Sequence, residues 1–185
     1  MRASTTGYPD AIARGDGFLV RKLADPASPD DSSQSTGEAR PRVLYVEDEK
    51  DNYDVLAYRL ADRYTIVWAE TDRQAIELLC EHGDDLYAVL MDIQLMGSAM
   101  DGIELTRAIR GIGSVDSPGP AITVMAEIPI IFLTGYISRY SREELAQAGG
   151  NALLGKPVDF RELVQALGEL GKARLDGKTH GAPAE

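Results

Sequence analysis

The sequence has few of the residues that form disulfides, membrane spans or export signals. Cys80 is the only cysteine among 185 residues, so an internal disulfide is excluded and a reducing compartment is expected. No run approaches the roughly 18–20 apolar residues that a spanning helix needs, and the N-terminus lacks a basic segment followed by an apolar one. These absences predict a cytoplasmic protein without membrane insertion. Because Cys80 falls within a helical pattern, we expect its thiol to be buried and inert.

Positive charge and histidine are also scarce. The chain has 19 Lys and Arg against 30 Asp and Glu, which gives a net charge of -11. Nucleic-acid surfaces depend on clustered Lys and Arg, so direct nucleic-acid binding is not expected. Of the two histidines, His82 is expected at the surface near a helix end and His180 in a polar tail, and neither is expected to carry a phosphoryl group. The acidity indicates either a solvated surface or a concentrated carboxylate site.

Composition divides the chain into three parts. Residues 1–41 are rich in Pro, Ser, Asp and Gly toward their end, and residues 172–185 are similarly polar. Such segments bury too little apolar surface to offset the entropy lost on ordering. We therefore predict a flexible N-terminal extension, one globular domain over residues 42–171 and a flexible C-terminal tail. The Gly- and Pro-containing stretch 111–126 is predicted to be an inserted loop.

Within the globular part, short apolar runs alternate with helical patterns. Residues 86–91 are apolar almost throughout, as expected of a strand buried on both faces. Thr71, Ser141 and Asp159 each have Gln or Glu three residues later, which marks the start of a helix. The alternation predicts an α/β fold, a doubly wound five-stranded parallel sheet flanked by five helices. The predicted strands are 42–46, 65–68, 86–91, 128–133 and 151–154, and the predicted helices are 51–61, 71–81, 101–110 and the segments that begin at Ser141 and Asp159.

Polar residues gather where the predicted strands end. In a parallel sheet the carboxyl ends of the strands lie at one edge, and ligands bind there. Crowded carboxylates repel one another unless a cation lies between them, and hard oxygen ligands favour Mg²⁺. A carboxylate beside Mg²⁺ can attack phosphorus, while an ammonium group and a hydroxyl stabilise charge on the phosphoryl oxygens. The residues that predict such a phosphoryl-transfer site are Glu47, Asp48, Asp92, Thr134 and Lys156.

This set of residues, in this order, resembles the receiver domain of bacterial response regulators, the chemotaxis-regulator-like switches of two-component signalling. The family pattern has an acidic pair after the first strand, an acceptor Asp after the third, Thr or Ser after the fourth and Lys-Pro after the fifth. Here these are Glu47-Asp48, Asp92, Thr134 and Lys156-Pro157. The resemblance covers about residues 41–171 and implies a flavodoxin-like sheet with strand order 2-1-3-4-5.

The resemblance implies a role for each residue. Asp92 would accept a phosphoryl group from a phosphohistidine of a histidine kinase or phosphotransfer protein. Asp48 and Asp92 would bind Mg²⁺ directly, and Glu47 would do so directly or through a metal-bound water. The other implied roles are a metal contact from the backbone carbonyl of Gln94, phosphoryl contacts from Thr134 and Lys156, and an influence of the Gln94 and Tyr136 side chains on the phosphoryl lifetime.

Two positions depart from the family pattern. Between Asp92 and Gly102 the loop is two residues longer than the usual Asp-Ile-x-Met-Pro-x-Met-Asp-Gly, and Met96 replaces the proline. We therefore expect a more mobile loop. Leu153 stands three residues before Lys156, where the family often has a Tyr or Phe whose ring moves on phosphorylation. Without this ring, a weaker conformational response is expected.

Three hypotheses for the function follow. The leading one is a stand-alone receiver that catalyses only its own phosphorylation and dephosphorylation and changes its contacts with a downstream protein. In it, the region of the fourth helix, fourth strand and fifth strand is a candidate homodimer surface. The second is a receiver-like interaction module that works without phosphorylation. The third, a Mg²⁺-dependent phosphatase or a flavin-binding protein on a similar sheet, lacks the Asp-x-Asp motif, and Glu47-Asp48-Glu49 would repel a flavin phosphate.

Overall fold

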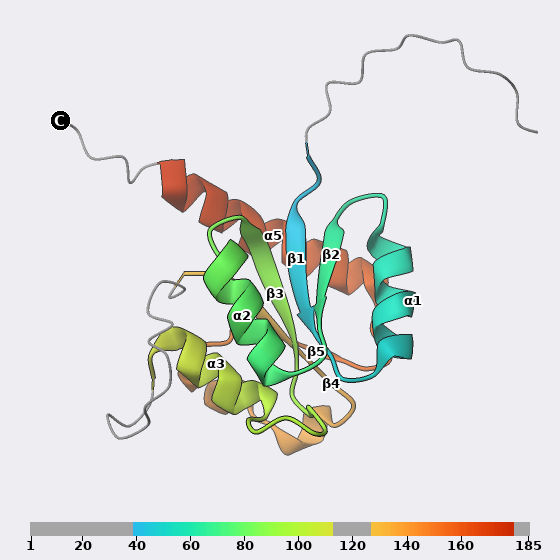
Figure 1. The fold of residues 1–185 in the computed structure, drawn as a ribbon, viewed down its shortest axis with the longest axis vertical. Helices are drawn as coiled ribbons and strands as arrows, with labels where there is room; N and C mark the ends of the chain where they lie inside the picture. Colours follow the sequence, from blue (N-terminus) through green and yellow to red (C-terminus); the bar gives the residue numbers. More distant parts are fainter. Residues whose placement is uncertain (1–38, 113–126, 180–185) are drawn as a thin grey trace, which may run out of the picture. The chain divides into compact units, whose positions relative to one another are not determined.

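The computed structural model describes residues 39–112 and 127–179 (Figure 1). Nearly all of the predicted extension, most of the predicted insertion and the last six residues of the predicted tail lie outside this part of the chain. Strands and helices alternate along it. The elements are β1 Arg42–Val46, α1 Lys50–Leu60, β2 Thr65–Ala69, α2 Asp72–His82, β3 Leu86–Asp92, α3 Gly102–Arg110, β4 Ile130–Thr134, η2 Ile137–Arg139, α4 Arg142–Gln147, β5 Ala152–Gly155 and α5 Phe160–Thr179.

The five strands form one parallel sheet in the order β2-β1-β3-β4-β5, which confirms the predicted fold and strand order. β1 and β3 are neighbours although β2 lies between them in sequence, so the strand order reverses at this point. The register pairs Val46 with Met91 and Asp92 with Leu133. The ends of β1, β3 and β4 therefore meet at one edge, where α/β sheets bind their ligands.

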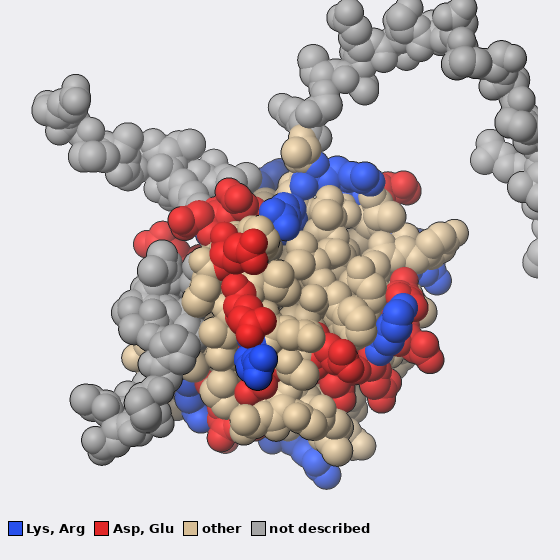
Figure 2. Space-filling view, in the orientation of Figure 1, with Lys and Arg blue, Asp and Glu red and all other residues tan. Residues whose placement is uncertain are grey.

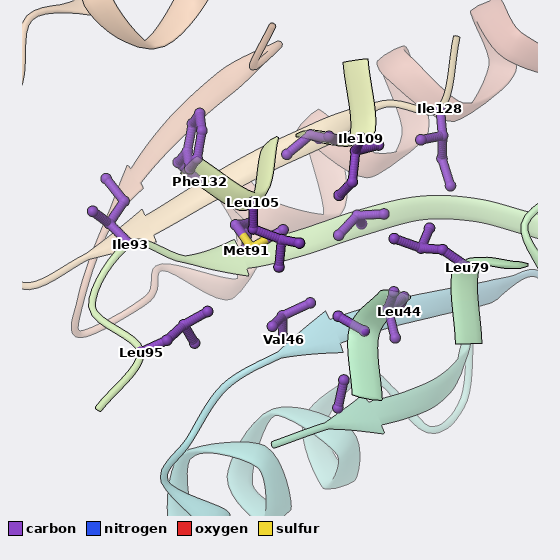
Figure 3. Packing of buried hydrophobic residues seen from close by; sticks show 14 of the residues in the cluster. Leu44, Val46, Leu79, Met91, Ile93, Leu95, Leu105, Ile109, Ile128 and Phe132 are labelled. Carbon is purple, nitrogen blue, oxygen red and sulfur yellow. The ribbon is translucent and has the colours of Figure 1, made fainter. Parts of the chain in front are cut away.

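Helices cover both faces of the sheet (Figure 1). On one face α2 and α3 pack over the strands, and Figure 3 shows Leu44, Met91 and Phe132 meeting Leu79 and Leu105 there. Alternate residues of the same strands point to the other face, where they pack against α1 and α5. Burial of each such aliphatic side chain contributes roughly 1.5–3 kcal/mol to the free energy of folding. The two clusters therefore stabilise the sheet whose strand ends carry the site.

Two expectations about individual segments are wrong. α5 continues to Thr179, so residues 172–179 are helical where a loose tail was expected. The reason lies in contacts that composition does not reveal: Gly171 packs against the ring of Tyr87, and the Arg174 guanidinium donates to the Gly83 carbonyl at 2.9 Å. Cys80 lies in α2 as predicted, but its side chain is exposed.

The charged surface agrees with the scarcity of basic clusters in the sequence. Figure 2 shows acidic side chains over α2 and beside the start of α1, with Lys and Arg in small separate groups. Within residues 39–112 and 127–179, no helix is both long and apolar enough to cross a membrane.

Candidate functional site

Three carboxylates meet at the edge of the sheet where β1 and β3 end. Glu47 and Asp48 follow β1, Asp92 is the last residue of β3, and one carboxylate oxygen from each lies within 4.8 Å of the others. Glu47 is fully buried and Asp92 nearly so. Burial raises the pKa of Asp92 above its ordinary value, and the Lys156 ammonium offsets this only in part. A cluster of hard oxygen donors that repel one another suits a divalent cation such as Mg²⁺.

Lys156 reaches this cluster from the end of β5. Its Nζ lies 2.6 Å from Asp92 Oδ2 and 2.6 Å from Glu47 Oε2, so one ammonium group bridges two carboxylates. Burial by itself would lower the pKa of Lys156, but the hydrogen bonds to Asp92 and Glu47 outweigh it and raise the pKa. Lys156 is therefore charged at neutral pH and holds the acidic cluster together.

Thr134 ends β4 beside the acidic cluster. It is fully buried, and it lies one residue past Leu133, the register partner of Asp92. Its backbone carbonyl accepts from the Lys156 amide at 2.7 Å, and its Oγ1 accepts from the Tyr136 amide at 3.1 Å. The hydroxyl proton remains available for another acceptor, because Oγ1 is the acceptor in this bond.

The predicted metal and lifetime positions near Asp92 are also at this edge. The Gln94 amide donates to Asp92 Oδ1 at 3.0 Å, so the backbone two residues after Asp92 already holds its carboxylate. A metal contact from the Gln94 carbonyl stays a prediction. Tyr136 is half exposed, and the Arg139 guanidinium lies 4.6 Å from the centre of its ring. Leu153 is partly buried against the same core cluster as Phe132.

The arrangement of strand ends agrees with a comparison against known protein families. Residues 43–168, which include all but the first residue of the five-stranded sheet, match the model of the response regulator receiver domain. The chain belongs to this family. The residues brought together here are those that the sequence analysis assigned to the receiver site.

Relatives of this receiver domain occur in several kinds of protein. It is 34% identical to the autoinducer 2 sensor kinase/phosphatase LuxQ of Vibrio vulnificus over 127 residues. This aligned stretch covers 68% of this chain and 13% of that protein. It is 31% identical over 148 residues to the transcriptional regulatory protein AruR of Pseudomonas aeruginosa, which covers 78% of this chain and 54% of that one. The chain thus spans from about an eighth to about half of the length of these relatives.

Solved structures show the same fold. The receiver domain of the Francisella response regulator 1452 superimposes with a TM-score of 0.59 at 20% identity, covering 73% of this chain and 99% of that one. The receiver domain of Saccharomyces cerevisiae Ssk1, solved together with the histidine phosphotransfer signaling protein Ypd1, gives a TM-score of 0.58 at 24% identity over 73% and 91% of the two chains. At these identities the likeness concerns the fold alone.

Several partners of Glu47 in this receiver domain were missed from the sequence. The Tyr45 hydroxyl donates to Glu47 Oε2, and Asn52 Nδ2 donates to Glu47 Oε1 at 2.8 Å. The indole Nε1 of Trp68 donates to the Glu47 backbone carbonyl at 2.7 Å, and its ring stacks on Tyr53. Burial, then the neighbouring Glu47 charge, raise the pKa of Tyr45 far above its ordinary value. Strand alternation, which places Tyr45 and Glu47 on one face, was the available signal.

The loop after Asp92 in this receiver domain is held by residues that the sequence analysis did not single out. The Met96 amide donates to Asp48 Oδ2 at 3.1 Å, and the Met100 amide donates to Asp72 Oδ2 at 3.0 Å. Ser98 Oγ accepts from the Asp72 amide at 3.2 Å. These contacts with Asp48 after β1 and with Asp72 of α2 oppose the mobility that was expected from the longer loop and the missing proline.

Proposed function

We propose that this receiver domain accepts a phosphoryl group on Asp92 from a phosphohistidine of a histidine kinase or phosphotransfer protein. The observation that supports it best is the position of Lys156 Nζ, 2.6 Å from Asp92 Oδ2. One Asp92 carboxylate oxygen forms a bond to phosphorus as the N–P bond of the phosphohistidine breaks, and the imidazole nitrogen that leaves takes up a proton. Later attack by water on phosphorus breaks the bond to the Asp92 oxygen, releases inorganic phosphate and returns Asp92 to the free carboxylate.

The neighbouring residues have complementary roles in this transfer. The Lys156 ammonium loses one of its two ionic partners when the Asp92 carboxylate becomes an acyl phosphate, and the phosphoryl oxygens offer it a new one. The Thr134 hydroxyl is a second donor toward these oxygens. Glu47, Asp48 and Asp92 would hold a Mg²⁺ ion, which would offset negative charge on the phosphoryl group. Together these groups favour the phosphorylated state.

The names of relatives support the choice of phosphoryl donor. LuxQ is a sensor kinase/phosphatase, and the Ssk1 receiver was solved with a histidine phosphotransfer protein. For this chain, a protein that carries a phosphohistidine is therefore the partner to test first. The stand-alone arrangement expected from the sequence stays a prediction.

The output is a change in protein contacts. If the Thr134 side chain moves toward a phosphoryl group, the distance from its Oγ1 to the Tyr136 amide changes, and the start of η2 shifts with it. Tyr136 and Ile137 are both half exposed there, so a shift of this segment changes an apolar surface. A downstream protein would bind this surface, and the region of α4, β4 and β5 remains the candidate homodimer surface.

Phosphotransfer from purified phosphohistidine donors tests the proposal. Wild type and Asp62→Asn, which changes an exposed aspartate after α1, should both be labelled, whereas Asp92→Asn should not. Labelling should require Mg²⁺ and stop with a chelator. Equal labelling of Asp92→Asn would refute the acceptor. Failure of every phosphohistidine donor and of a small-molecule phosphodonor to label folded wild type would favour the alternative, an interaction module that works without phosphorylation.

A further inference from the structure

Glu47 is the most enclosed member of the acidic cluster. Its side chain is fully buried, and Oε2 accepts from both Lys156 Nζ and the Tyr45 hydroxyl. Oε1 accepts from Asn52 Nδ2 at 2.8 Å. A buried carboxylate without partners is costly, and of the three side chains that donate to Glu47 in the described part of the chain only Lys156 is a cation.

Lys156 divides its charge between two carboxylates. Its Nζ lies 2.6 Å from an oxygen of each, so any shift of the ammonium toward a phosphoryl group on Asp92 weakens its bond to Glu47. Glu47 would then lose the one cationic side chain that pairs with it among the described residues, while staying buried. The hydrogen bonds from the Tyr45 hydroxyl and the Asn52 amide to Glu47 would remain, because neither group is hydrogen-bonded to Asp92.

We propose that Tyr45 and Asn52 are positioning residues that keep the Glu47 carboxylate directed at the metal site when Lys156 moves to a phosphoryl group. This inference rests on the proposed function. Glu has one more rotatable bond than Asp, so a Glu in this place has more orientations to lose. Tyr45 lies in β1 and Asn52 in α1, so two elements fix the carboxylate from different directions.

Tyr45 has a second explanation that an experiment must separate from this one. A buried tyrosine hydroxyl needs a hydrogen-bond partner, and Glu47 would serve even if its orientation did not matter. Asn52 bears on this question because its amide also donates to Glu49 Oε2 at 3.0 Å and is half-buried, so it could be solvated without Glu47. A positioning role predicts that both residues act on metal binding and that they act through Glu47.

Magnesium titration of the full chain provides the readout. Trp68 is the only tryptophan, and its indole donates to the Glu47 carbonyl, so its fluorescence can follow the site, with calorimetry as an independent measure. Tyr45→Phe and Asn52→Ala should each weaken Mg²⁺ binding by about 10-fold, as substitutions of residues that orient metal ligands do. The loss should be larger with beryllofluoride, a phosphoryl mimic that draws Lys156 away.

The controls separate positioning from packing. Tyr64→Phe removes the hydroxyl of another buried tyrosine in the same core cluster as Tyr45. Tyr64 directly precedes β2, so it lies at the opposite edge of the sheet from the acidic cluster. This variant should leave the Mg²⁺ affinity unchanged. In a Glu47→Gln background, Tyr45→Phe and Asn52→Ala should have no further effect on affinity. Circular dichroism of each variant confirms that it is folded.

Each outcome decides one question. If Glu47→Gln weakens Mg²⁺ binding but Tyr45→Phe and Asn52→Ala do not, the inference is wrong and the proposed function stands. An equal loss in the wild-type and Glu47→Gln backgrounds also overturns it, because the residues would not act through Glu47. If wild type does not bind Mg²⁺ and is not labelled on Asp92, the proposed function itself fails.

Discussion

Replacement of Gly102 by Ala should damage both stability and the site, because α3 begins against the backbone of Asp92, the proposed phosphoryl acceptor. A Cβ at Gly102 would lie 2.0 Å from the Asp92 carbonyl oxygen and 3.0 Å from the Ile93 Cα. The Gly102 amide also donates to the Ile93 carbonyl at 3.0 Å. The methyl group therefore meets backbone on the opposing segment, and space can be made only by moving Asp92 or α3.

The expected cost follows from two opposing effects. Overpacking of a well-packed interior costs typically about 1–3 kcal/mol, and a rigid backbone contact belongs at the upper end. Ala favours the helix over Gly by at most about 1 kcal/mol. Gly102→Ala should therefore lower the free energy of unfolding by about 2 kcal/mol, which corresponds to a fall in Tm on the order of 6 °C. Mg²⁺ binding should weaken as well, because the Asp92 carboxylate moves with its backbone.

Gly168→Ala in α5 is the matched control. A Cβ there would meet nothing within 4 Å, so this variant should gain up to about 1 kcal/mol from helix propensity alone. Urea unfolding followed by Trp68 fluorescence, with a Mg²⁺ titration on each variant, measures both effects. If Gly102→Ala is as stable as Gly168→Ala and binds Mg²⁺ like wild type, the argument from close approach is wrong.

Three further predictions concern the loop, the lysine and the switch. Asp72→Ala leaves the Met100 amide without its acceptor and should cost about 1–3 kcal/mol, with faster amide exchange in residues 94–100; unchanged exchange there would show that Asp72 does not hold the loop. Because the pKa of Lys156 is raised on folding, its stabilisation should be complete below its unfolded pKa of about 10.4 and be lost as the pH rises through the folded value. In metal-free protein, the difference in unfolding free energy between wild type and Lys156→Met should thus be constant to about pH 10 and then shrink; a decline near neutral pH would contradict it. Leu153→Tyr should enlarge the amide chemical-shift changes around β4, α4 and β5 that Mg²⁺ and beryllofluoride produce, and equal changes in both proteins would show that the missing ring does not limit the response.

The sequence predicted those parts of the site that depend only on the order of strands. Asp92 and Lys156 follow apolar strands, and parallel strands bring such ends to one edge whatever the details of packing. Asn52 could not be assigned in this way, because its contact with Glu47 depends on how α1 leaves the loop after β1. Asp72 was missed for the same reason, because its partners Ser98 and Met100 lie in the loop after β3, and their contact with Asp72 depends on how this loop packs against α2.

The wrong predictions share a physical cause. Polar composition after Gly171 indicated a loose tail, yet a helix can continue on polar residues when its first turns are packed and a side chain such as Arg174 binds another element. A helical pattern around Cys80 indicated burial, but periodicity alone does not decide which neighbouring position faces the sheet. Composition describes what a segment can bury, and tertiary contacts decide whether it is ordered.

The bridge from Lys156 to Glu47 and Asp92 has a consequence for the protein before any ion arrives. With the three acids ionised, the ammonium leaves a formal charge of about -2 in the pocket, so the metal-free domain carries its own counter-ion. Folding then need not wait for magnesium, in contrast to small domains that are unfolded without their metal. The Lys156 ammonium thus lets the domain fold first and leaves the acidic pocket ready for a cation afterwards.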